Sequence, residues 1–235
     1  MNFKMQGLEN VRLRLQKACA QAGRDPDGVR ILAVAKKHPP DKIREAFAAG
    51  LADIGENLVQ EALEKQRQLA DLAIRWHFIG TIQSNKTSEL AAHFGWVQSV
   101  DRLKILKRLS AQRSSEQPPL NICLQVNIDR EPQKSGVLPE ALTELAAHAA
   151  EAPRLVLRGL MAIPQAGQDE AGARDSFRRV RQLYDALRAQ GHDLDTLSMG
   201  MSADLEAAVA EGSTLVRIGT DLFGPRPDSK ESDTA

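Results

Sequence analysis

The feature that constrains this chain most is an alternation between two hydrophobic periodicities, repeated eight times. Short apolar runs that favour β-strands alternate with stretches whose apolar residues recur at helical spacing. The expected strands cover residues 29–35, 51–55, 75–80, 96–100, 120–128, 155–163, 196–200 and 214–219. A further amphipathic helix, with Leu8, Val11 and Leu15 on one face, precedes the first strand.

Strands that alternate with helices, without a long linker, predict a parallel sheet covered by helices. Eight such units predict one closed (β/α)8 barrel of the TIM type, and 235 residues suit the roughly 250 typical of that fold. The alternative is an open doubly wound sheet, which usually has fewer strands and a glycine-rich first turn, whereas the first turn here is AKKHPP. We therefore predict an α/β barrel domain over residues 1–226, preceded by the extra helix, and a disordered tail over residues 227–235.

Composition excludes several classes of function. The chain has 31 basic and 31 acidic residues, so its net charge is zero. It therefore lacks the excess positive charge that would attract nucleic acid or an anionic membrane. Cys19 and Cys123 cannot build a disulfide framework, and neither the cysteines nor the five histidines have metal-ligand spacing. Because there is no signal peptide and no run of about 20 apolar residues, we expect a soluble cytoplasmic protein.

In a barrel of this type the active site lies on the loops that follow the carboxyl ends of the strands. Lys36 follows an apolar strand, where it is either the solvated end of the strand or an amine whose pKa is lowered by partial burial, ready to condense with an aldehyde. Lys37 is expected to point the other way. Glu56 is interpreted as an exposed loop carboxylate, with a catalytic base as the alternative. The remaining candidates by position are Asn57, Gly80, Asp101, Asn127, Met161, Ser202, Arg217, Gly219 and Thr220.

The loops after the seventh and eighth strands favour an anion. Ser202 is expected as the N-cap of a helix, where free backbone N–H groups attract negative charge. Gly219 allows close approach of the backbone to a ligand and Thr220 supplies a hydroxyl, at the frequent phosphate site of these barrels. Arg217 should point into the barrel, where it either forms a structural ion pair or faces a ligand atom.

Seven segments together resemble the pyridoxal phosphate homeostasis protein family. They are LAVAKK, IGEN with VQEA, WHFIGTIQSNK, QVNIDREPQKSG, RGLMAIP, LSMGMSADLEAAVAEGST and VRIGTDLFG, in order from Ile31 to Gly224. The resemblance implies a single barrel like the N-terminal domain of alanine racemase, carrying pyridoxal 5'-phosphate (PLP). Two departures are Ala35, where the family often has serine, and the arrangement of lysine and histidine in KKH.

The resemblance also implies roles for individual residues, none of them catalytic. Lys36 would form the internal aldimine with PLP, and Arg217 would approach the pyridine nitrogen. The phosphate would be held by Ser202, Gly219 and Thr220. The pocket would be lined by Asn57 and Met201.

A cationic arginine beside the ring nitrogen disfavours its protonation, which makes the ring a poor electron sink. Racemases of this fold also need a tyrosine from a further domain, whereas Tyr184, the only tyrosine here, lies in the middle of a predicted helix. We therefore expect a monomeric, non-enzymatic carrier that buffers PLP and delivers it to apo PLP-dependent enzymes. Lys134 is either a second amine for that transfer or a solvated loop lysine.

Two other functions stay open. One is a PLP-dependent amino-acid racemase or lyase, and the other is a phosphate-binding barrel without PLP, such as a sugar-phosphate isomerase.

Overall fold

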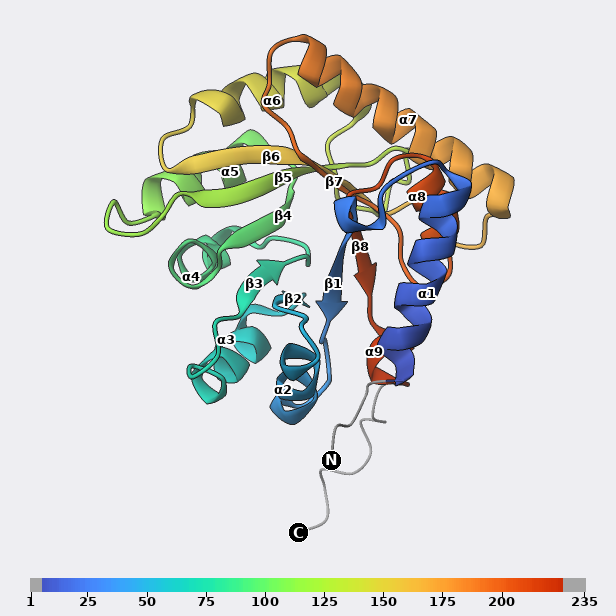
Figure 1. Cartoon of the computed structure of the whole chain (residues 1–235). Helices are drawn as coiled ribbons and strands as arrows, with labels where there is room; N and C mark the ends of the chain where they lie inside the picture. Colours follow the sequence, from blue (N-terminus) through green and yellow to red (C-terminus); the bar gives the residue numbers. More distant parts are fainter. Residues whose placement is uncertain (1–5, 226–235) are drawn as a thin grey trace.

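The eight apolar runs form eight parallel strands, and each strand pairs with its neighbour in sequence. In the computed structural model, which describes residues 6–225, β1 also pairs with β8, so the sheet closes into a barrel (Figure 1). The closed barrel is confirmed, and the open sheet is wrong. The strands are β1 (Arg30–Val34), β2 (Asp53–Glu56), β3 (Arg75–Phe78), β4 (Trp96–Val100), β5 (Leu120–Val126), β6 (Leu155–Ala162), β7 (Thr196–Ser198) and β8 (Leu215–Ile218).

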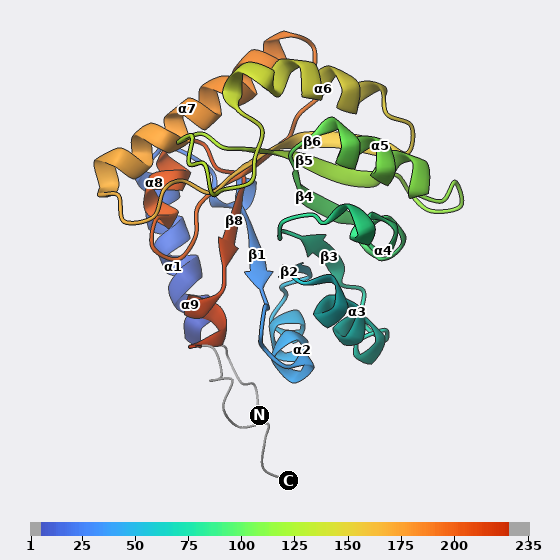
Figure 2. The same cartoon turned by 180° about the vertical axis from the view of Figure 1, so that it is seen from behind.

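The helices surround the barrel, as both views show (Figures 1 and 2). Most of them connect one strand to the next, which is the connection that parallel neighbours require. They are α1 (Gln6–Gln21), α2 (Pro40–Ala48), α3 (Val59–Gln68), α4 (Thr87–His93), α5 (Leu103–Gln112), α6 (Leu142–Glu151), α7 (Glu170–Ala189), α8 (Leu205–Ala210) and α9 (Thr220–Phe223).

The strands are buried on both faces, which explains why their sequences are almost continuously apolar. Outward side chains such as Ala33, Ile54 and Val216 are fully buried and belong to the main hydrophobic core, which lies between the barrel and the helices. Neighbouring strands approach closely at Gly159 in β6, where a Cβ atom would lie 1.7 Å from the carbonyl oxygen of Thr196. A side chain at this position would force β6 and β7 apart.

The N-terminal helix ties together the two ends of the described chain. It lies beside α8 and α9 (Figure 1). From this helix Arg14 donates to the carboxylates of Glu206 and Asp221 and to the carbonyl oxygen of Ser202, at 2.7 to 2.8 Å. One side chain of α1 therefore holds the loops that follow β7 and β8.

Two local expectations are wrong. Helix α8 begins at Leu205 with Asp204 at its N-cap, so Ser202 is not the N-cap. The reason is a turn before the helix, in which the Asp204 carboxylate accepts from the backbone N–H of Met201 at 2.5 Å. Strand β7 ends at Ser198 because Gly200 adopts a positive φ of 93°. The expected domain end at residue 226 and the tail at 227–235 lie outside the described residues.

Candidate functional site

A cavity of about 440 Å³ opens at the carboxyl end of the barrel, within the size range of small-molecule sites. It receives side chains from the loops after β1, β2, β3, β6, β7 and β8. All seven residues expected to hold a cofactor line it, namely Lys36, Asn57, Met201, Ser202, Arg217, Gly219 and Thr220. The structure thus brings together residues that lie up to 184 positions apart in the chain.

The remaining wall of the cavity includes residues that sequence reasoning did not select. His38 and Thr81 contribute polar atoms, and Val34, Ile79 and Ile163 contribute apolar surface. Their position in the predicted fold could have identified them, because each lies at or just beyond the carboxyl end of a predicted strand. The same positional rule also selected Asp101, Asn127 and Met161, which do not line the cavity.

The charged side chains on the cavity wall are cationic. Lys36 and Arg217 line it, and none of the described lining residues is an aspartate or glutamate. A cavity with this charge favours an anionic ligand, because an anion is attracted by the two cations of the lining.

Arg217 is buried inside the barrel, as expected, with 4% of its surface exposed. Its terminal nitrogens donate to the carbonyl oxygens of Ser198 and Ala162 and to the Ser198 hydroxyl, at 2.7 to 2.8 Å. No carboxylate within residues 6–225 forms an ion pair with it, so the structural ion pair is wrong. Burial lowers the pKa of Arg217 to about 10, and the guanidinium keeps its charge at neutral pH.

A chain of buried hydrogen bonds continues from Arg217 through the barrel. The Ser198 hydroxyl donates to Gln98 Oε1 at 2.7 Å, and Gln98 Nε2 lies 2.9 Å from His77 Nδ1. Because His77 Nε2 lies 3.0 Å from the Asp53 carboxylate, which can only accept, the imidazole carries its proton on Nε2 and accepts from Gln98 on Nδ1. Every bond in the chain therefore runs from the guanidinium toward Asp53.

The far end of this chain is a fixed negative charge. Burial alone would raise the pKa of Asp53, but hydrogen bonds from Arg75 and His77 hold it well below its usual range. Burial also lowers the pKa of His77, so the imidazole stays neutral. Asp53 thus fixes the orientation of the groups that hold Arg217.

Lys36 lies in the turn that follows β1, partly buried in the cavity wall. Lys37 is exposed and does not line the cavity, but it lies in the turn with a φ of +64°, where the strand alternation that was to direct it toward the helix layer does not apply. The expectation that Glu56 is an exposed loop carboxylate is wrong. It is fully buried between β2 and α3. Its Oε1 accepts from Lys65 Nζ at 2.7 Å. Burial raises the pKa of Glu56 to about 7 against the opposing effect of Lys65.

The loops after β7 and β8 supply Ser202, Gly219 and Thr220, with Thr220 as the first residue of α9. Strand β8 pairs with β1, so Gly219 and Thr220 follow the strand beside the one that precedes Lys36. On the other side of β1, the loops after β2 and β3 touch at Gly80. A Cβ atom on Gly80 would lie 2.2 Å from the carbonyl oxygen of Asn57, so only glycine permits this contact. This contact helps to hold Asn57 in the cavity wall.

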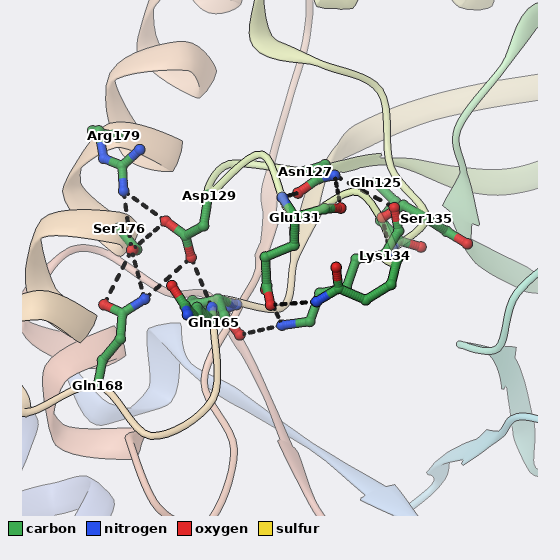
Figure 3. A network of polar contacts seen from close by, with 12 residues as sticks. Gln125, Asn127, Asp129, Glu131, Lys134, Ser135, Gln165, Gln168, Ser176 and Arg179 are labelled. Carbon is green, nitrogen blue, oxygen red and sulfur yellow. Dashed lines mark hydrogen bonds and ion pairs between the residues drawn. The ribbon is translucent and has the colours of Figure 1, made fainter.

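Lys134 lies in the loop after β5, outside the cavity lining. Figure 3 shows its amine between the Glu131 carboxylate, at 2.5 Å, and the backbone of the loop after β6, where it donates to Pro164 at 2.9 Å. In the same figure Asp129 accepts from Ser176 and Arg179 of α7, which fixes the base of the loop. Lys134 is therefore held in an ion pair and is not a fully solvated lysine.

Within residues 6–225, no group of three or more His, Cys, Asp or Glu side chains is placed to hold a metal ion. The helices in that range are also too short or too polar to cross a membrane.

Fold and site together define a class of protein, the (β/α)8 barrels with a lysine and a buried arginine in a cavity at the carboxyl end of the strands. The family described as alanine racemase, N-terminal domain, matches residues 8–227. The chain is 56% identical over 226 residues to the pyridoxal phosphate homeostasis protein of Pseudomonas aeruginosa, covering 96% of this chain and 97% of that one. Its counterpart in Escherichia coli K12 is 45% identical, covering 98% and 100%. The chain belongs to the pyridoxal phosphate homeostasis protein family, within the alanine racemase N-terminal domain family.

Solved structures agree with this assignment. PipY of Synechococcus elongatus, solved with PLP bound, is 37% identical, with a TM-score of 0.79 over 90% of this chain and all of that one. Alanine racemase of Corynebacterium glutamicum is 14% identical, with a TM-score of 0.68, and this chain covers 63% of it. This second similarity concerns the fold alone.

Proposed function

We propose that this protein binds PLP reversibly at the carboxyl end of the barrel and serves PLP homeostasis. The observation that carries the proposal is the cavity itself, which combines a lysine, a buried guanidinium and two loops suited to an anion, without a carboxylate in its described lining. The names of the relatives and the PLP bound in PipY support it.

The residues present fit PLP in size and charge. The cavity of about 440 Å³ suits a single aromatic ring with a phosphate. In the proposed arrangement Ser202, Gly219 and Thr220 hold the phosphate, Arg217 faces the pyridine nitrogen, and Asn57 and Met201 line the ring. When bound, PLP would supply an aldehyde, and Lys36 is the residue whose amine would condense with it.

The same arrangement supports a carrier over an enzyme. A charged guanidinium that is held by two carbonyl oxygens and a hydroxyl disfavours a proton on a ring nitrogen facing it. Without that proton the ring withdraws electrons weakly, which disfavours carbanion chemistry. Tyr184 is buried in α7 and donates to the carbonyl oxygen of Leu194 at 2.7 Å. Its hydroxyl is therefore used in a structural hydrogen bond and does not face the cavity.

Absorption spectroscopy with chemical trapping tests the proposal. We expect a yellow band on addition of PLP, and borohydride should bleach it and leave a phosphopyridoxyl mass on the peptide that contains Lys36. Lys36→Ala should abolish the band, while Lys37→Ala, a matched change at the exposed neighbour, should keep it. A protein that stays colourless with PLP, or a label on another lysine, would refute the assignment.

An amino-acid racemase or lyase is the second candidate, and the observation that favours it is His38. This histidine lines the cavity two residues after Lys36, with its ring 5.1 Å from that of Phe223, and could move a proton. Deuterium exchange at Cα of amino acids tests this function. Exchange at catalytic rates that disappears in both Lys36→Ala and His38→Gln would replace the carrier proposal.

We also propose that a cytoplasmic monomer delivers PLP to apo PLP-dependent enzymes, and that Lys134 can assist transfer only after leaving Glu131. Lys134→Ala tests the second point. If PLP loading and transfer to an apo-enzyme are unchanged in this variant, Lys134 has no part in transfer.

A further inference from the structure

The turn that carries Lys36 is closed by a backbone hydrogen bond from His38 N–H to the carbonyl oxygen of Ala35, at 3.0 Å. Lys36 and Lys37 are its central residues. Lys37 has a φ of +64°, whereas the φ of Lys36 is not positive, which defines a type II turn. This turn type favours glycine at the position of Lys37, because a side chain there lowers the population of the conformation roughly 5- to 30-fold.

Both peptide groups that flank Lys36 are bonded to side chains of α3. Glu61 Oε1 accepts from the backbone N–H of Lys37 at 2.6 Å. Lys65 Nζ donates to the carbonyl oxygen of Ala35 at 2.8 Å. The backbone on either side of Lys36 is therefore held by two residues one helical turn apart.

These two side chains also hold each other. Lys65 Nζ donates to Glu61 Oε1 at 2.6 Å and to Glu56 Oε1 at 2.7 Å. Lys65 is 5% exposed, so its ammonium group cannot turn to solvent. It depends on these two carboxylates and on the carbonyl oxygen of Ala35. The cluster of Glu56, Glu61 and Lys65 is thus a fixed frame beside the turn.

The bond from Lys37 N–H to Glu61 selects the orientation of the central peptide. A type I turn differs from type II by rotation of this peptide through about half a turn, which changes ψ of Lys36 from about +120° to about −30°. In the type I form the N–H points away from Glu61, and Lys37 loses its strained φ. Removing the acceptor should therefore free the turn to exchange between the two forms, so that the backbone carrying Lys36 is no longer held in one conformation.

We propose that Glu61 and Lys65 are positioning residues, which hold the turn in the type II form and so keep the backbone of Lys36 fixed while its amine meets the aldehyde of PLP. This inference rests on the proposed function. Neither residue lines the cavity, and both act through the backbone on either side of Lys36.

The test compares PLP with pyridoxine 5'-phosphate, which carries a hydroxymethyl group where PLP has the aldehyde and so reports ring and phosphate binding alone. In Glu61→Ala we expect the Kd for PLP to rise roughly tenfold, in line with the strain at Lys37. The Kd for pyridoxine 5'-phosphate should change by less than about twofold. Glu64→Gln, on an exposed face of the same helix, is the matched control and should behave like the wild type.

Two further variants separate positioning from general stability. Glu61→Gln keeps an oxygen that can accept from Lys37, so PLP affinity should stay near the wild-type value. Glu61→Ala combined with Lys37→Gly should recover most of the affinity, because glycine favours the type II turn without help. In the protein without ligand, hydrogen exchange at the Lys37 amide should be roughly tenfold faster in Glu61→Ala than in Glu61→Gln.

The outcomes are distinct. An unchanged Kd for PLP in Glu61→Ala, equal losses for both ligands, or no recovery with Lys37→Gly would each overturn the positioning role. A wild-type protein that forms no reducible link to PLP while it binds pyridoxine 5'-phosphate would overturn the proposed function itself.

Discussion

Glu56→Gln should change how the stability of the protein depends on pH. Glu56 is fully buried, and burial raises its pKa from 4.5 to about 7. The native state therefore holds this proton more tightly than the unfolded chain. The stabilisation is complete below about pH 4.5 and is lost as the pH rises through 7. The glutamine side chain of the variant carries no such proton, and its amide oxygen can still accept from Lys65.

The magnitude follows from the shift. A change of about 2.5 pKa units corresponds to about 3 kcal/mol of unfolding free energy. For a chain of this size 1 kcal/mol moves Tm by about 2–4 °C. Between about pH 4.5 and about pH 8, Tm of the wild type should therefore fall by about 6–12 °C more than Tm of Glu56→Gln.

Thermal unfolding followed by circular dichroism across this pH range measures the difference. Glu140→Gln is the control, because the exposed ion pair with Arg130 lowers the pKa of Glu140, so Glu140 is ionised in the native state across the window and in the unfolded chain over most of it. Its curve should run parallel to that of the wild type. Parallel curves for the wild type and Glu56→Gln would refute the argument from burial.

Three further predictions concern the packing of the barrel. Gly159→Ala should lower the unfolding free energy by about 3 kcal/mol or more, because its Cβ would meet Thr196 and φ is +154°. A wild-type urea midpoint would contradict this. Arg113→Met should cost about 3 kcal/mol, since Arg113 is buried and donates four hydrogen bonds to three backbone carbonyls, and an unchanged midpoint would rule that out. Cys19 and Cys123 are buried with raised pKa values, about 12 for Cys123, so a thiol reagent should label them only after denaturation; rapid labelling of the native protein would show otherwise.

The barrel could be predicted from sequence because its strands are buried on both faces and its helices on one. Each element therefore leaves a local pattern that needs no knowledge of its partners. The position of Lys36 and of Gly219 at the carboxyl end followed from the fold by a rule that applies to all such barrels. The start of α8 was harder to predict, because Ser202 lies in a turn before the helix that the Asp204 carboxylate stabilises by accepting from Met201 N–H.

The groups that support the site could not be predicted, because they come from distant positions. His77, Gln98 and Ser198 lie on three different strands, and no local pattern shows that they meet. Glu56 follows the predicted strand over residues 51–55, where an exposed carboxylate is the ordinary expectation, but the structure makes it the last residue of β2. Only its pairing with Lys65, on the next helix, shows that it is buried.

The contacts of Arg14 have a consequence for how the protein is made. Arg14 is made before every strand of the barrel, whereas its partners Ser202, Glu206 and Asp221 are among the last described residues to be synthesised. Throughout translation of the intervening strands, α1 has an apolar face without its final neighbours. The loops after β7 and β8 can be joined to α1 only after residues 202–221 have been made, so the capacity to hold a ligand arrives after all eight strands have been synthesised.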